Sequence, residues 1–278
     1  MSVRIITDST SDLTPEVRAR VGVIPLSIRF GEEEYIDGVT ITTDEFYRKL
    51  SSGSVLPTTS QATPASFEKL FRETVEAGDT AVVITIASGL SGTYQSGVIA
   101  AEDYPGKIFV VDSENVAIGA GILVEYALKL ADQGMEAGRI AAELTKLRSK
   151  VYLVAVVDTL EYLRKGGRIS KTVAFAGGLL SIKPVISVAG GELKMINKAR
   201  GNKQANAVMN QEIDKLGKVD FSKPVMLGYT GCSDELLQKY IAESVDYWGG
   251  RTFPSTVVGS TVGVHAGPGA VAAAFFVE

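Results

Sequence analysis

The stretch Ala81-Val82-Val83-Ile84-Thr85-Ile86, followed by Ser88-Gly89-Leu90-Ser91-Gly92-Thr93, indicates the fold of this chain most clearly. Its first half is a nearly continuous apolar run, which is typical of a strand buried on both faces of a parallel sheet. Glycines and hydroxyl residues then lead into a helical stretch at residues 94–102. A buried strand, a turn and a helix in this order are the repeating unit of a parallel α/β sheet.

Similar units lie on both sides of this stretch. Residues 3–7 form a β-branched run that ends in a turn and cap cluster at residues 8–12, and Pro15 suits the first turn of a following helix. Residues 108–111 predict a further strand, and residues 118–132 predict a long helix. We therefore predict a parallel sheet covered by helices in the first part of the chain.

The pattern changes near residue 150. A predicted strand at residues 151–157 and a short helix at 158–163 precede a basic, glycine-containing loop at 164–171. Gly190-Gly191 separates two strand-like runs and predicts an antiparallel hairpin. The remaining predicted elements are helices at 202–216 and at 233–247, the latter capped by Ser233, and strands at 225–229 and 272–277.

These patterns predict an α/β protein of two domains. Residues 1–150 would form an N-terminal parallel α/β sheet domain, and residues 151–278 a C-terminal mixed, partly antiparallel α/β domain. A chain of 278 residues exceeds the usual size of one domain, about 100–150 residues. We expect a ligand to bind between the two domains.

Composition narrows the functional classes. The apolar stretches are interrupted well short of the roughly 18–20 residues that a membrane span needs, so we expect no integral membrane association. Met1 leads directly into the first strand, which argues against a secretory signal. A single cysteine, Cys232, suits a reducing cytoplasm, and a net charge of −4 gives no general attraction to nucleic acid. We predict a cytoplasmic protein with no nucleic-acid partner.

Two kinds of chemistry are poorly supported. The chain has no G-x-x-x-x-G-K-[ST] motif, which argues against a P-loop nucleotide site. With one histidine and one cysteine it is poorly equipped for a transition-metal site. We therefore predict no metal, no cofactor and no catalytic residue.

Hydroxyl residues provide the main candidate site. Residues 88–95 place glycines, Ser91 and Thr93 where a helix begins, and its free N–H groups and dipole favour an anion there. The alternative is that Ser91 only caps the helix. A second cluster, Thr58-Thr59-Ser60-Gln61, lies in a predicted loop, and its simplest interpretation is a plain turn before the next helix.

Two further features have open interpretations. His265, the only histidine, lies in a predicted glycine-rich loop, where it could be a ligand donor, a general base or a purely structural residue. Two basic clusters could be solvated surface or a docking patch for an acidic partner. They consist of Arg164, Lys165, Arg168 and Lys171, and of Lys198, Arg200 and Lys203.

Several motifs together resemble those of a known family, and they occur in its order from near residue 3 to the C-terminus. They are Thr7-Asp8-Ser9-Thr10-Ser11-Asp12, Tyr35-Ile36-Asp37, Thr59-Ser60-Gln61, Leu90-Ser91-Gly92-Thr93-Tyr94-Gln95, Tyr162-Leu163-Arg164-Lys165-Gly166-Gly167-Arg168-Ile169 and His265-Ala266-Gly267-Pro268-Gly269. On these residues the chain resembles the DegV family. It departs from that family at Ala62, where proline is frequent, and at Ala87, where serine is common.

The resemblance implies a two-domain α/β protein that binds one fatty acid and has no activity of its own. In bacteria with a fatty acid kinase, DegV-like proteins present the acid to the kinase, which phosphorylates its carboxylate. By the same resemblance, Thr59 and Ser91 would bind the carboxylate, with the Gly92 amide and His265 nearby. Ser60 and Thr93 would support them, and Arg168 and Arg200 would face the kinase.

Simple energetics agree with this role. A chain of about fourteen buried methylenes contributes roughly 11 kcal/mol before the costs of association, so the tail of a C14–C18 acid such as palmitate can supply the affinity. The head group then needs only neutral donors that satisfy a buried carboxylate. The alternative function is an enzyme, phosphotransferase-like, that acts on a small anionic substrate through His265. A long apolar cavity would favour the carrier, and a small polar one the enzyme.

Overall fold

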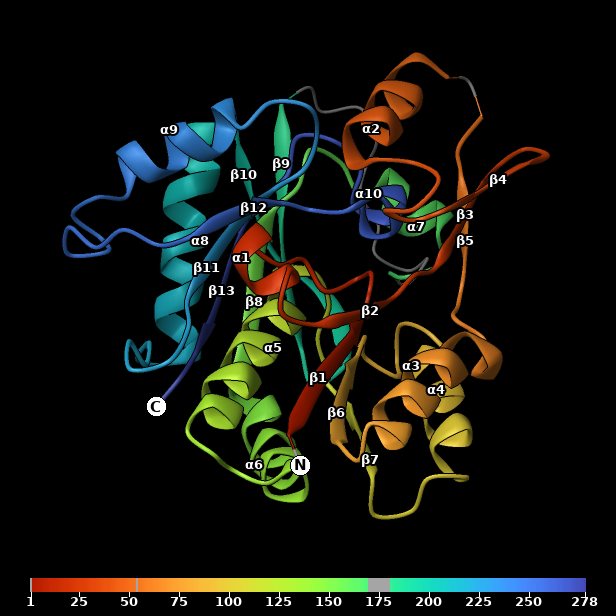
Figure 1. Cartoon of the computed structure of the whole chain (residues 1–278). Coiled ribbons are helices and arrows are strands. Elements are labelled where there is room, and N and C mark those ends of the chain that lie inside the picture. Colours follow the sequence, from red (N-terminus) through yellow and green to blue (C-terminus); the bar gives the residue numbers. More distant parts are fainter. Residues whose placement is uncertain (1, 54, 170–180) are drawn as a thin grey trace.

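The computed structural model describes residues 2–53, 55–169 and 181–278 (Figure 1). These residues form a four-stranded sheet, a six-stranded sheet and a small three-stranded sheet, with helices packed around them. The mixed α/β fold class predicted from the sequence is confirmed.

The four-stranded sheet is parallel throughout, as predicted. Its strand order is β2-β1-β6-β7, with bounds Gly22–Ile24, Val3–Asp8, Thr80–Thr85 and Ile108–Asp112. Helices α3 (Pro64–Glu76) and α4 (Thr93–Ala101) bury apolar side chains on one face, which includes Ile6 and Val83. Helices α5 (Ala117–Asp132) and α6 (Ala137–Leu147) cover the other face, which includes Ile5 and Val82. Alternate residues of β1 and β6 thus face opposite layers, as the pleat of a strand requires.

The six-stranded sheet is mostly antiparallel, and only β11 and β12 run parallel. Helices α8 (Asn202–Leu216) and α9 (Glu235–Glu243) pack on its outer face, while α5 lies against its inner face. Helix α5 is therefore shared between the two large sheets (Figure 1). The strand order is β10-β9-β8-β13-β11-β12, with bounds Glu192–Arg200, Ile182–Ala189, Val151–Val156, Val271–Phe276, Met226–Tyr229 and Ser255–Val257.

The three-stranded sheet was not predicted. Its order is β4-β3-β5, with bounds Glu33–Ile36, Ser27–Phe30 and Thr58–Ser60, and α2 (Thr43–Ser52) packs beside it. The strands are only three or four residues long, so their alternation is too brief to stand out in the sequence. The other short elements are α1 (Pro15–Arg18), the 3₁₀ helix η1 (Arg148–Lys150), α7 (Glu161–Lys165) and α10 (Ser260–Ala266).

Three local predictions were wrong. Thr58–Ser60 is an edge strand rather than a loop, because it pairs with β3 and places Thr59 opposite Ile28. The helix predicted at residues 233–247 is α9, which ends at Glu243 and begins after Asp234; Ser233 accepts a hydrogen bond from the N–H of Glu235 instead. His265 lies in the last turn of α10 rather than in a loop.

The division of the chain at residue 150 stays a prediction. Strands of the parallel sheet and of the three-stranded sheet come before this residue, and those of the six-stranded sheet come after it. The largest cluster of buried apolar residues, however, contains members from both halves, from Ile5 to Phe276. Within the described ranges, no helix is long and apolar enough to cross a membrane.

Candidate ligand-binding site

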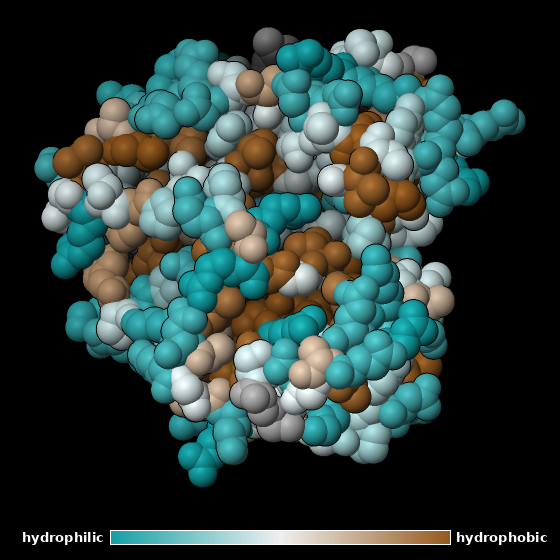
Figure 2. All heavy atoms as spheres, viewed as in Figure 1, coloured by the Kyte–Doolittle hydropathy of each residue, from teal (hydrophilic) through white to brown (hydrophobic). Residues whose placement is uncertain are grey.

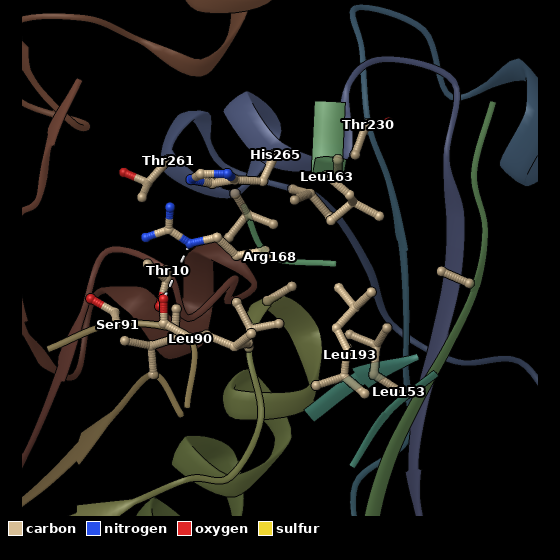
Figure 3. Close-up of a pocket in the computed structure, with 18 of the residues that line it drawn as sticks. Thr10, Leu90, Ser91, Leu153, Leu163, Arg168, Leu193, Thr230, Thr261 and His265 are labelled. Carbon is tan, nitrogen blue, oxygen red and sulfur yellow. Dashed lines mark hydrogen bonds between the residues drawn. The ribbon is translucent and has the colours of Figure 1, made fainter. Parts of the chain in front are cut away.

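A cavity of about 260 Å³ lies between the inner face of the six-stranded sheet and the loops that follow β1 and β6 (Figure 3). Helix α10 and the start of α5 close its other sides. The wall that the six-stranded sheet contributes is largely apolar. It consists of Leu153, Ala155, Val157, Ile186, Val188, Leu193, Ala270 and Ala272.

Most of the predicted site residues meet at this cavity. Thr59, Ser60, Ser91, Gly92 and His265 all line it, although they come from three separate segments of the chain. The Thr59 Oγ1 and His265 Nε2 atoms are 2.9 Å apart. We call Thr59, Ser91, Gly92 and His265 the polar cluster.

Ser91 and Thr93 act as a pair at the start of α4. Their hydroxyl oxygens are 3.0 Å apart, and the N–H of Thr93 donates to Ser91 Oγ at 3.3 Å. Gly92 is the N-cap residue of α4, so Ser91 itself lies just before the cap. Thr93 is fully buried outside the cavity lining and accepts a hydrogen bond from the Ala62 N–H at 3.3 Å. Thr93 thus lies behind Ser91, and its supporting role at the site stays a prediction.

Gln61 was missed as a member of this group. Its side-chain oxygen lies so close to Gly92 that a Cβ there would come within 2.1 Å of it. The Gln61 amide nitrogen donates to Ser96 Oγ at 3.2 Å, which holds the side chain in place. Gly92 therefore has a steric reason to be glycine. Gln61 directly follows the hydroxyl cluster in the sequence, and this position was the available signal.

His265 is held as a neutral imidazole. Burial, together with the nearby positive charge of Arg168, lowers its pKa from 6.5 to about 4. The ring lies against the backbone of Gly166, where a Cβ would come within 2.1 Å of Nδ1. When Nε2 carries the ring proton, it donates to Thr59, and the Thr59 hydroxyl hydrogen is free to bind an anion in the cavity.

The two predicted docking arginines lie in different surroundings. Arg168 lines the cavity and donates to the carbonyl oxygen of Leu90 at 3.3 Å (Figure 3). It also donates to the carbonyl oxygen of Gly166 at 2.6 Å. Arg168 therefore lies beside the hydroxyl residues of the cavity, because Leu90 directly precedes Ser91. Arg200 is exposed at the end of β10 and does not line the cavity. Lys171, the last member of the first basic cluster, lies outside the described residues.

Thr10 and Thr261 are hydroxyl residues of the cavity wall that were not predicted, and both bind carboxylates. Thr10 Oγ1 donates to Asp8 Oδ1 at 2.5 Å, and Thr261 Oγ1 donates to Asp37 Oδ2 at 2.7 Å. Their hydroxyl hydrogens are thus used by buried carboxylates outside the lining. Thr10 belongs to a motif noted in the sequence, whereas Thr261 had no such signal.

A second hollow, of about 830 Å³, is bordered by β1, the ends of α5 and α6, and part of α3. Figure 2 shows hydrophobic atoms gathered in a hollow near the middle of one face, in the region of β1 and β2. None of the predicted site residues borders this second hollow. The described ranges contain no group of three or more His, Cys, Asp or Glu side chains that could hold a metal ion.

Comparison with known proteins places this fold in one class. Residues 2–278 match a family model described as uncharacterised protein, DegV family. A DegV domain-containing protein of Caldanaerobacter subterraneus is 35% identical over 280 residues, covering 99% of each chain. The chain therefore belongs to the DegV family.

Solved structures of this family have the same fold. The chain superposes on a fatty-acid-binding DegV family protein from Thermus thermophilus with a TM-score of 0.87 and 31% identity, covering 100% of both chains. It also resembles a stearic acid-binding protein from Eubacterium ventriosum, with a TM-score of 0.86 and 28% identity over 99% of this chain and 98% of that one.

Proposed function

We propose that this chain binds one long-chain fatty acid, with its carboxylate at the polar cluster and its tail along the inner face of the six-stranded sheet. The observation that carries the proposal is the union of a few neutral polar groups with a largely apolar wall in one cavity. The fatty acids named for the related structures support the same class of ligand.

The polar cluster is suited to a carboxylate that must stay reactive. Thr59 and Ser91 can each donate a hydroxyl hydrogen, and neutral His265 orients Thr59 from behind. Hydrogen bonds from such donors prevent an unsatisfied buried charge without neutralising it. The Arg168 guanidinium donates to two backbone carbonyl oxygens, so two of its N–H groups are not available to the carboxylate.

The apolar wall is suited to a chain of about C14–C18, such as palmitate, because each buried methylene contributes roughly 0.8 kcal/mol. Denaturing extraction of the protein purified from a bacterial host, followed by mass spectrometry, should recover about one such acid per chain. Consistent recovery of none, together with no uptake of added palmitate, would contradict the proposal.

We also propose that the bound acid is presented to a partner, a fatty acid kinase in the cytoplasm, and that this chain has no catalytic activity of its own. Arg200 is exposed and Arg168 lies at the cavity, so together they could mark a surface for an acidic partner. Arg200→Glu should slow acyl-phosphate formation in a reconstituted assay, more so at low salt, and leave acid binding unchanged. Arg168→Glu tests the same role at the cavity itself.

An unchanged rate of acyl-phosphate formation with both variants would contradict the proposal that Arg168 and Arg200 bind the partner. The alternative function, an enzyme that uses His265 on a small anionic substrate, makes a different prediction. It requires turnover by the chain alone that disappears in His265→Ala.

A further inference from the structure

Two sequence motifs have no part in the polar cluster, yet both place a buried carboxylate near α10. Asp12 ends the motif at residues 7–12, and Asp37 ends the motif at residues 35–37. Their exposed fractions are 6% and 5%, and neither residue lines the cavity. A buried carboxylate is costly unless it is hydrogen-bonded, so the partners of these two side chains indicate what they do.

Both carboxylates bind the N-terminal end of α10. The N–H of Gly259, the N-cap residue, donates to Asp12 Oδ1 at 2.6 Å. Thr261 donates to Asp37 Oδ2 twice, through its N–H at 3.3 Å and its hydroxyl at 2.7 Å. The first N–H groups of a helix have no partner within the helix, and a carboxylate satisfies them with a charge-assisted bond.

The rest of α10 is held mainly by close packing. At Gly263 an added Cβ would come within 2.7 Å of Phe46 and Tyr47, and at Gly267 within 2.3 Å of the Tyr162 ring. Such contacts pack the helix closely against these rings, but packing contacts are less directional than hydrogen bonds. The helix has only seven residues and carries His265 in its last turn. Because the helix is short, its N-terminal hydrogen bonds lie within about two turns of the imidazole.

We infer that Asp12 and Asp37 are positioning residues, which hold α10 so that His265 Nε2 lies within hydrogen-bond distance of Thr59 Oγ1. Neither carboxylate contacts the ligand, and each acts through His265. The effect on acid affinity rests on the proposed function, whereas the effect on His265 does not.

Electrostatics support a role other than stability. Burial raises the pKa of Asp12 well above its usual value, although the Gly259 hydrogen bond lowers it, and the charges of Asp37 and Asp8 raise it further. Burial likewise raises the pKa of Asp8. Burial of the Asp12 carboxylate therefore costs stability, which is consistent with its retention for the placement of α10.

The test uses the full chain and its single histidine, since every imidazole NMR signal comes from His265. Asp37→Ala should raise the pKa of His265 from about 4 toward its ordinary value, because a displaced ring is less buried and its charged form is better hydrated. Palmitate affinity should fall roughly tenfold, as expected for one misplaced hydrogen bond. Asp37→Asn keeps an oxygen for Thr261 and should restore both properties.

Glu212→Ala is the matched control. Glu212 is a buried carboxylate on α8 with its own partners, Asn197 and Lys215, and it does not line the cavity. If Asp37→Ala loses stability like Glu212→Ala but leaves the His265 pKa and the affinity unchanged, the inference is overturned. If Asp37→Ala does not fold, Asp12→Ala replaces it and should change the pKa of His265 and the palmitate affinity in the same direction by smaller amounts. If Asp12→Ala changes neither of them, the inference is also overturned.

A third outcome separates this inference from the proposed function. If the parent protein takes up no fatty acid, but Asp37→Ala still raises the pKa of His265, the positioning role stands and the proposed ligand is wrong.

Discussion

Two pairs of hydroxyl residues line the same cavity, and they differ in what their hydrogen bonds leave free. Thr10 and Thr261 donate their hydrogens to the buried carboxylates of Asp8 and Asp37, so these hydrogens are not available to a ligand in the cavity. Thr59 and Ser91 instead have partners behind them that can donate, His265 and Thr93. Their own hydrogens then remain available to a ligand.

The comparison shows that residue type alone does not tell whether a hydroxyl can donate to a ligand. A threonine keeps its hydroxyl hydrogen for a ligand when its neighbour donates to it, and it uses that hydrogen when its neighbour is a carboxylate. The pairs therefore predict opposite results for the same kind of substitution.

The largest effect is expected at the polar cluster. Ser91→Ala and Thr59→Val each remove one donor from a buried carboxylate, which should weaken palmitate binding roughly ten- to a hundredfold. Their effects should be less than additive, since both residues serve one head group. Isothermal titration of acid-free protein with palmitate measures the change, and circular dichroism checks the fold. Unchanged affinity in both variants would mean that the hydroxyls are only structural.

Much of the fold could be predicted from the sequence because its core strands are long and apolar. The runs at β1, β6 and β7 and the helical period of α8 were recognisable without tertiary information. The strand β5 was not, because its three residues are polar and partly exposed, and pairing with β3 alone makes them a strand.

The polar cluster could be predicted only in part. Ser91 and Gly92 lie at a strand-to-helix turn with a local signal, but the approach of Thr59 to His265 joins residues that are 206 positions apart. Only the family resemblance brought them together beforehand. The roles of Asp12 and Asp37 depend on helix α10, which was not predicted because the sequence around it is rich in glycine.

A smaller effect is expected on the apolar wall, where register defines a row of small residues. Ala155 pairs with Ala272, which pairs with Gly228, and all three line the cavity. Ala272→Val adds two carbons to this row and should displace about two methylenes of a long acid, weakening it roughly fifteenfold. Shorter acids should be affected less, which a C10–C18 competition series would measure.

The neighbouring Ala273 offers the control for that series. It points to the opposite face of β13, into the core under α8 and α9. Ala273→Val should therefore reduce stability without changing the preference for chain length. Equal changes of preference in both variants would show that the row of small residues does not set the capacity of the cavity.

The next effect concerns stability rather than affinity. Asp12→Asn keeps an oxygen for the Gly259 N–H but removes a buried charge, so it should stabilise the fold at neutral pH by on the order of 1 kcal/mol. The pKa of Asp12 is raised in the folded state, so the parent loses stability as pH rises from about 4 toward that raised value. The advantage of the variant should grow over the same pH range and then level off.

Urea unfolding of both proteins at a series of pH values measures this difference. A variant that is less stable than the parent at neutral pH would show that the Asp12 charge contributes favourably to α10. It would also indicate that burial of the Asp12 carboxylate does not lower the stability of the fold.

The smallest effect is expected at Thr10, where the comparison between the two pairs is sharpest. Thr10→Val has nearly the same shape and removes a hydroxyl whose hydrogen is already directed to Asp8. Asp8 keeps two further donors, the N–H groups of Thr10 and Ile86, so the loop after β1 should retain its shape. Stability should fall by about 1 kcal/mol for the lost hydrogen bond, whereas palmitate affinity should change less than about twofold. The same titration that detects Thr59→Val provides the measurement. A tenfold loss at Thr10 would mean that its hydroxyl turns from Asp8 to the ligand when the acid binds, and the distinction between the two pairs would then fail.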